Sequence, residues 1–252
     1  MASTLTTSVA SKSSNSISPQ SDAPYNEYHE REGPLVGQKY KKTKASFNQA
    51  SSVPTMNIGT LLSLRITGHA LVCQKKYAKA EAKYQIAFNG LKESLGWQHE
   101  ETLSCLNDLG ISLYHQNKFT EAKRKYQSAF EGLKELLGPQ HPKTLACLQH
   151  IGSALYRQAK YIEAESTYRQ VYWERRKALG AHHKDTLSAL QDVGDALLCQ
   201  NRYIESAAEY RKVYRTRQRT LGERHQDTRL VLFKIGKALE YKNPHAAIIG
   251  KS

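Results

Sequence analysis

A fixed interval of 42 residues runs through most of this chain. Threonine recurs at this interval from Thr60 to Thr228, and glycine recurs at it from Gly68 to Gly236. An aromatic residue keeps the same step at Tyr77, Phe119, Tyr161 and Tyr203. A repeated unit of this length predicts an architecture in which each unit buries its apolar face by stacking on its neighbours.

Each unit divides into two helical patterns. In the second unit, apolar residues recur at steps of three and four in two runs: Leu103, Leu106, Leu109 and Leu113, and then Phe119, Ala122, Tyr126, Ala129 and Leu133. That spacing marks one apolar face on each of two helices. The sequence QNK at 116–118 forms a short polar turn between them, and Leu-Gly ends the second helix. We therefore predict an all-α fold of antiparallel helix pairs.

The repeat sets the expected domain organisation. Residues 1–55 are rich in Ser and Thr and show no helical or strand periodicity, so we expect a disordered leader. Residues 56–241 form the predicted repeat domain, with units at about 56–97, 98–139, 140–181 and 182–223 and a half repeat at 224–241. Residues 242–252 are the expected mobile tail.

The linker between units contains two adjacent histidines, His182 and His183, with Asp185 two residues on, which raises the question of a metal site. Their stretch, LGAHHKDTL at 179–187, has counterparts in LGWQHEETL at 95–103, LGPQHPKTL at 137–145 and LGERHQDT at 221–228. A repeated linker favours a structural role. We expect Gly180 to cap one helix, and the linker histidine to pack or hydrogen-bond between neighbouring repeats. The four cysteines also follow the repeat and lack zinc-ligand spacing, so we predict no metal and no cofactor.

The repeated glycine lies inside the first helix of each unit, where glycine costs about 1 kcal/mol relative to alanine. We expect this cost to permit close approach of the second helix, whose own small residue recurs at Ala80, Ala122, Ala164 and Ser206. The large aromatic side chains of Tyr84, Tyr126, Tyr168 and Tyr210 are then expected to fill the space between successive units.

The order of these residues resembles the tetratricopeptide repeat family. The stretches LNDLGISLYHQNKFTEAKRKYQSAF (106–130) and LQHIGSALYRQAKYIEAESTYRQVY (148–172) carry Leu-Gly, an aromatic residue in the turn, then alanine and a further aromatic residue. The unit with Leu-Gly, His and Thr-Leu in its linker is similar to the kinesin-light-chain type of repeat. Arg175 and Arg217 stand at its usual arginine, from which Leu91 and Leu133 depart. The resemblance covers about residues 58–241 and implies a right-handed α-α superhelix, a tetratricopeptide solenoid.

In that family the first helices line a concave groove that holds an extended or helical peptide. The resemblance assigns the groove to positions three and two before, and one after, the glycine. The candidate binding residues are Arg65, His69, Asn107, Asp108, Gln149, His150, Ser153, Gln191, Asp192 and Asp195, beside Ile66 and Ile111. The amides of Asn107, Gln149 and Gln191 are either a ladder able to hydrogen-bond a bound backbone or simply solvated side chains. The carboxylates favour a partner that offers basic or amide groups.

The formal charge of +14 leaves two functions open. The basic residues gather on the predicted second helices: Lys123, Arg124, Lys125, Arg175, Arg176, Lys177, Arg211, Lys212, Arg215, Arg217 and Arg219. We favour a protein-protein interaction scaffold or adaptor that binds a peptide segment in the groove. The alternative is a basic outer surface that binds nucleic acid without sequence specificity.

Other classes of protein fit the sequence less well. Polar residues recur by repeat instead of converging as nucleophile, base and orienting group, so we predict that the chain is not an enzyme. No run of 18 apolar residues is present, and we therefore expect no membrane span. Cysteines without disulfide spacing suit the cytoplasm, with the nucleus as the alternative. The sequence leaves the oligomeric state open.

Overall fold

The computed structural model describes residues 56–242 of the 252-residue chain. The expected leader at 1–55 and the expected tail beyond residue 242 lie outside the described residues. Within residues 56–242 the secondary structure consists of helices and short turns. The helices are α2 (Ile58–Cys73), α3 (Tyr77–Leu95), α4 (Glu100–His115), α5 (Phe119–Leu137), α6 (Pro142–Arg157), α7 (Tyr161–Leu179), α8 (Lys184–Cys199), α9 (Tyr203–Leu221) and α10 (Gln226–Lys242). None of these helices is long and apolar enough to cross a membrane.

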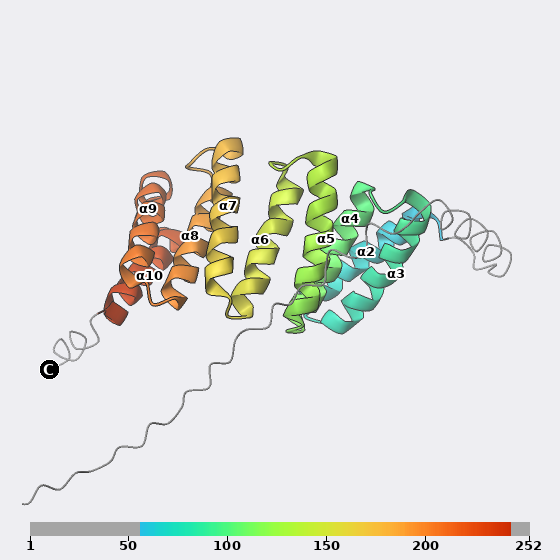
Figure 1. Cartoon of the computed structure of the whole chain (residues 1–252), viewed down its shortest axis with the longest axis horizontal. Helices are drawn as coiled ribbons and strands as arrows, with labels where there is room; N and C mark the ends of the chain where they lie inside the picture. The colour runs from blue at the N-terminus through green and yellow to red at the C-terminus, as the bar shows by residue number, and fades with distance from the viewer. Residues whose placement is uncertain (1–55, 243–252) are drawn as a thin grey trace, which may run out of the picture. The chain divides into compact units, whose positions relative to one another are not determined.

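The helices stack in chain order, and each packs chiefly on the helices before and after it (Figure 1). The first helices α2, α4, α6 and α8 pair with the second helices α3, α5, α7 and α9, and α10 follows as the first helix of the half repeat. The predicted all-α fold of helix pairs is confirmed. The helix boundaries keep the 42-residue interval, since α4, α6 and α8 begin at Glu100, Pro142 and Lys184.

The repeated apolar positions form the core. In the second unit, Leu106, Leu109 and Leu113 of α4 and Ala122 and Tyr126 of α5 are all at most 3% exposed. Removing a leucine side chain from water contributes roughly 2 kcal/mol. The same positions are buried in the neighbouring units, so apolar packing continues from one pair to the next. Stacking therefore supplies the core that a single pair lacks.

The repeated glycine is required by a tyrosine ring. A Cβ atom added at Gly110 would lie 2.6 Å from Cε1 of Tyr126, and one added at Gly152 would lie 2.6 Å from Cε1 of Tyr168. Such distances are too short for any side chain, so the expected close packing at the glycine is confirmed. The ring belongs to the second helix of the same pair. It therefore fills space within a unit. The Tyr126 ring also packs on His150 of the next unit, with the ring centres 5.0 Å apart, so the expected packing between successive units holds for this ring as well.

The linker histidine begins the next first helix. His183 is the N-cap of α8, and its Nδ1 accepts a hydrogen bond from the backbone N–H of Asp185 at 3.2 Å. The same bond recurs in each linker, from His99 to Glu101, His141 to Lys143 and His225 to Asp227. The hydrogen bond that we expected between repeats thus lies within one helix. Gly180 ends α7 with a φ of 88°, as its capping role requires.

Candidate functional site

The predicted groove residues lie on the first helices and bond to one another across repeats. The residue three positions before the glycine of one unit meets the residue two positions before the glycine of the next unit. Three pairs follow this rule: Arg65 Nε with Asp108 Oδ2 at 2.6 Å, Asn107 Oδ1 with His150 Nδ1 at 2.9 Å, and Gln149 Nε2 with Asp192 Oδ2 at 2.7 Å. We call these six residues the polar row. It runs from α2 to α8 and joins each unit to the next.

The N-terminal end of the polar row is an ion-pair cluster. Asp108 is only 7% exposed, and it pairs with Arg65 and with Nε2 of His69 at 2.9 Å. Arg65 also reaches Glu101, with Nη1 and Oε2 2.6 Å apart. Burial works against the charge on Arg65, but the two carboxylates outweigh it and raise the pKa of the guanidinium. Since breaking a buried ion pair leaves an uncompensated charge, Arg65 and Asp108 have a structural role here.

The middle of the polar row is uncharged. Oδ1 of Asn107 is bonded to His150 and also accepts from Sγ of Cys147 at 3.3 Å. Burial lowers the pKa of His150 to about 4, with Asp108 opposing that shift, so this imidazole is neutral at physiological pH. Its ring packs on Tyr126 with the ring centres 5.0 Å apart. His150 therefore orients Asn107 and contributes no charge to the groove.

Two carboxylates of α8 lie in different surroundings: Asp192, which ends the polar row, and Asp195, three residues further on. Asp195 forms an ion pair with Nζ of Lys234 at 2.6 Å and accepts a hydrogen bond from the hydroxyl of Tyr210. Asp192 accepts from Gln149 but forms no ion pair with any described residue. Burial raises the pKa of Asp192 to about 6, because the carboxylate loses water without gaining a cation at contact distance.

Asp192 and Asp195 lie in a hollow of about 160 Å³, which we call the acid hollow. The other residues that line it are Tyr114, Ser153, Tyr156 and Tyr168. The hydroxyl of Tyr168 donates to Oγ of Ser153 at 3.3 Å, and the hydroxyl of Tyr156 lies 3.0 Å from Sγ of Cys199. Carboxylates beside tyrosine rings can hold a cationic group through ion pairing and cation–π attraction.

Tyr114 and Tyr156 were not among the predicted groove residues. Each tyrosine lies four residues after the repeat glycine, and Tyr156 therefore stands three positions after Ser153, on the same face of α6. That spacing could have predicted both tyrosines as groove residues. The rule taken from the family resemblance covered only three positions around the glycine and stopped one helical turn too early.

Arg175 and Arg217 lie in the joints between units. Nη1 of Arg175 donates to the backbone carbonyl of Asp185 at 3.0 Å, and Nη1 of Arg217 donates to that of Asp227 at 3.3 Å. Arg217 also donates to Oε1 of Gln191 at 3.1 Å. Each arginine thus links a second helix to the start of the next first helix. Our assignment of these two residues to the outer basic surface is therefore wrong.

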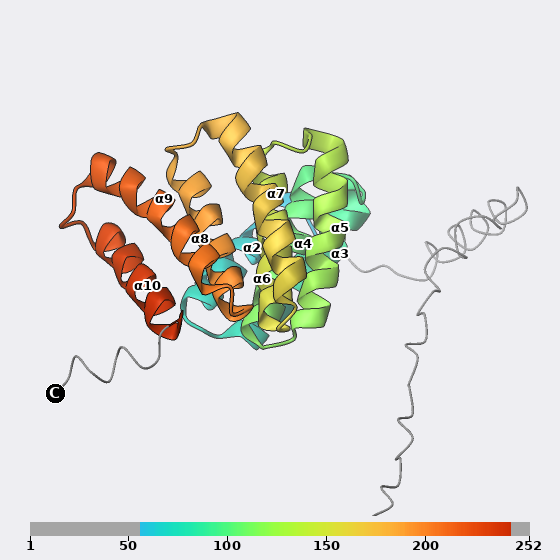
Figure 2. The ribbon, with the colours of Figure 1, turned by 60° about the vertical axis from the view of Figure 1, so that its left-hand side comes forward.

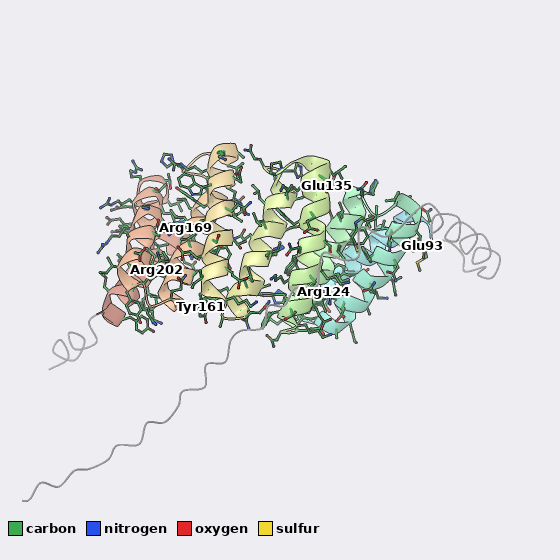
Figure 3. The ribbon with its side chains drawn as sticks, viewed as in Figure 1. Glu93, Arg124, Glu135, Tyr161, Arg169 and Arg202 are labelled. Carbon is green, nitrogen blue, oxygen red and sulfur yellow. The ribbon has the colours of Figure 1, made fainter. Side chains whose placement is uncertain are left out.

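Part of the remaining outer charge is neutralised. Figure 3 labels Arg169 of α7 and Arg202 before the start of α9, and Glu165 forms ion pairs with both, at 2.9 and 2.7 Å. An uncompensated basic strip does occur on α9, where three exposed arginines form no ion pair with any described residue: Arg211, Arg215 and Arg219. These lie at successive helical turns.

Comparison with known proteins agrees with this architecture. Models described as tetratricopeptide repeat match residues 60–135, 109–172 and 186–227. No curated protein matches the sequence.

Three solved structures show the same fold at low sequence identity. The nearly identical repeats of a kinesin-light-chain-like protein from Podosopora anserina align with a TM-score of 0.69 and 16% identity, over 76% of this chain and 91% of that one. BtubC from P. vanneervenii aligns with a TM-score of 0.61 and 15% identity, over 75% and 77% of the two chains. The Rap conjugation gene regulator of plasmid pLS20, solved with the Phr* peptide, aligns with a TM-score of 0.54 and 14% identity, over 85% and 66%.

Proposed function

Because this chain belongs to the tetratricopeptide repeat family, with repeats of the kinesin-light-chain type, we propose that it is a non-enzymatic scaffold or adaptor that binds a peptide segment along its first helices. The Rap regulator of plasmid pLS20, which shares the fold, was solved in complex with a peptide. The cytoplasm is the proposed setting, since the described cysteines are free and burial raises the pKa of the Cys105 and Cys147 thiols to about 12.

The acid hollow is the observation that carries this proposal. Asp192 is a partly buried carboxylate without a cationic partner among the described residues, and the rings of Tyr114 and Tyr156 line the same hollow. A lysine or arginine side chain of a peptide would supply the missing positive charge and pack its methylene groups on the rings. The proposed ligand is therefore a peptide with one basic side chain seated at Asp192.

The three amides support binding of the peptide backbone on either side of that anchor. Asn107 uses its oxygen, Gln149 its nitrogen and Gln191 its oxygen in bonds to neighbouring side chains. Within the described residues, no hydrogen bond uses the opposite end of these amide groups. Each amide is thus held in orientation by one end and can offer the other to a ligand, which lowers the entropy cost of binding.

Selection of peptides from a random displayed library on the full-length chain tests this proposal. We expect the selected sequences to share a lysine or arginine at one position. Asp192→Asn should weaken their binding at least tenfold, since it removes the only charge assigned to the anchor. The matched control is a variant with alanine at Arg211, Arg215 and Arg219. It should bind the selected peptides as the wild type does. Selected peptides that bind Asp192→Asn normally would contradict the proposal.

Nucleic-acid binding is the second candidate, and the exposed arginine strip of α9 is the observation that favours it. If the strip binds phosphates, the triple alanine variant loses about three contacts, and the salt dependence of log K should flatten by roughly 0.7 to 0.9 per contact. Electrophoretic titration of the wild type and this variant with a short duplex, at several salt concentrations, distinguishes this function from the groove.

A further inference from the structure

The outward side of α10 is apolar. Figure 2 shows α10 at the end of the stack beyond α9. On it, Leu232, Phe233 and Leu239 are 50%, 62% and 38% exposed, and Gly236 lies among them. We call these four residues the terminal face. Exposed apolar patches of this kind mark interaction surfaces on soluble proteins.

The positions of Leu232 and Leu239 are covered in the other units, whereas Phe233 takes the groove position of Asn107, Gln149 and Gln191. Residues equivalent to Leu232 are Leu106, Leu148 and Leu190, at 1%, 6% and 4% exposure, and those equivalent to Leu239 are Leu113, Leu155 and Leu197, at 3%, 4% and 0%. In each of these units the second helix of the pair seats a tyrosine ring on the glycine. At Gly236 an added Cβ would meet no described atom within 4 Å. The terminal face therefore has the residues with which a first helix packs on the second helix of its pair.

The two ends of the stack differ. On the outward side of α2, the exposed residues are Ser63, Thr67 and Ala70, where the second unit has the buried residues Cys105, Leu109 and Ser112. Of the two outermost described helices, α2 has the polar outer side that keeps the end of a repeat stack soluble. Because α10 keeps apolar residues instead, its outward side is suited to a partner.

We propose that the terminal face binds an amphipathic helix of a partner protein, with an aromatic residue seated on Gly236. The described chain contains four examples of a second helix that packs on a first helix in this way, and these define the ligand. Each second helix presents a small residue, an aromatic residue four positions later and a small apolar residue three positions after that: Ala80, Tyr84 and Ala87; Ala122, Tyr126 and Ala129; Ala164, Tyr168 and Val171; Ser206, Tyr210 and Val213.

One charged position refines the ligand. Arg229 is exposed and takes the place that Leu103 has in the second unit. Leu103 packs at Gly132, where an added Cβ would lie 2.6 Å from its Cδ2, and Gly132 is six residues after Tyr126. By the same geometry, Arg229 faces the ligand residue six positions after the aromatic residue. An aspartate or glutamate there would pair with the guanidinium.

A labelled peptide with the sequence of residues 119–137 and Gly132→Glu is the probe. We expect fluorescence anisotropy to show that the full-length chain binds it. Gly236→Leu in the chain should weaken binding at least tenfold, since the leucine side chain occupies the position where the aromatic ring would bind. Tyr126→Ala in the probe should also weaken binding at least tenfold, since it removes the ring. Gly236→Leu should not unfold α10, because leucine favours helix more than glycine does and the site is open.

Two controls make the test specific. Ile204→Glu changes an exposed apolar residue of α9 outside the terminal face, and it should leave probe binding unchanged. Arg229→Glu should weaken the Gly132→Glu probe at least threefold and leave a probe with the unaltered Gly132 unaffected.

A folded chain that does not bind the probe, or one that binds it equally well after Gly236→Leu, would overturn the proposal. Sedimentation that shows self-association of the wild type but not of Gly236→Leu would also overturn it, because the occupant would then be a second copy of the chain. None of these results depends on the groove, so they test the terminal face independently of the proposed peptide binding at Asp192.

Discussion

At the residue scale, one glutamine of the third unit lacks the partner that its counterparts have. Nε2 of Gln116 donates to Glu81 at 2.6 Å, and Nε2 of Gln200 donates to Glu165 at 2.9 Å. Gln158 stands between them in the repeat, and its Nε2 is buried with no hydrogen-bond partner among the described residues. The equivalent of the two glutamates is Lys123, which is a donor and has no acceptor to offer.

Lys123→Glu should therefore stabilise the protein. The new carboxylate would accept from Gln158, and satisfying a buried donor contributes about 1 kcal/mol, or roughly 2 to 4 °C in Tm for a domain of this size. Thermal denaturation followed by circular dichroism measures the change. Arg124→Glu makes the same change of charge at the exposed neighbouring position and should gain less. Equal gains would mean that net charge, and not Gln158, causes the effect.

A backbone position in the same region can also be improved. The turn between the two helices of each pair contains a residue with positive φ: 59° at Lys75, 62° at Asn117, 59° at Ala159 and 61° at Asn201. Asparagine tolerates this conformation better than alanine does. We expect Ala159→Asn to stabilise the protein by about 0.5 to 1 kcal/mol, seen as a higher urea midpoint with an unchanged m-value. Asn201→Ala should shift the midpoint in the opposite direction.

At the element scale, the repeat interval alone predicted the helices well. The expected helical span was 58–241, and the helices occupy 58–242, because buried positions at helical spacing determine both where a helix forms and which side it buries. The contacts between units were harder to predict. The polar row depends on how neighbouring first helices are displaced along their axes, which brings together residues 43 apart, such as Gln149 and Asp192. A 42-residue period does not specify that displacement.

The contact between glycine and tyrosine holds the two helices of each pair together. Gly152→Leu should destabilise the protein by about 1 to 3 kcal/mol, because the added side chain would displace the Tyr168 ring that holds α6 against α7. Denaturant unfolding measures this cost. Gly236→Leu is the matched control, since an added Cβ there meets no described atom within 4 Å and should leave stability unchanged or slightly raised. A similar loss at both glycines would show that the tyrosine ring is not the cause.

At the scale of the whole molecule, the acid hollow depends on the intact stack, since α4, α6, α7 and α8 all contribute to it. Asp192 has a pKa of about 6 in the folded chain and about 3.9 when unfolded. The folded state therefore holds its proton more tightly. The contribution of Asp192 to stability is most favourable below about pH 4, falls as the pH rises from about 4 to 6, and stays reduced above that range.

Asp192→Asn should consequently raise stability at pH 7.5 by about 1 to 2 kcal/mol, since it removes an ionised carboxylate that no cation neutralises. The amide oxygen can still accept from Gln149. At pH 4 the variant and the wild type should differ little, because Asp192 is then protonated in the folded state. Thermal melts at the two pH values measure the difference. A gain of equal size at both would show that the carboxylate charge is not its source.

The same carboxylate links ligand binding to pH. A basic side chain in the hollow pairs with ionised Asp192, and with a pKa of about 6 only about one tenth of the free protein is ionised there at pH 5, against about nine tenths at pH 7. We therefore expect the affinity for a selected basic peptide to rise roughly tenfold between these pH values. Calorimetry at constant ionic strength measures this rise. Asp192→Asn should bind more weakly and without pH dependence. Neutral His150 should add nothing, since its pKa of about 4 lies below the range. A pH-independent affinity of the wild type would remove Asp192 as the anchor of the ligand.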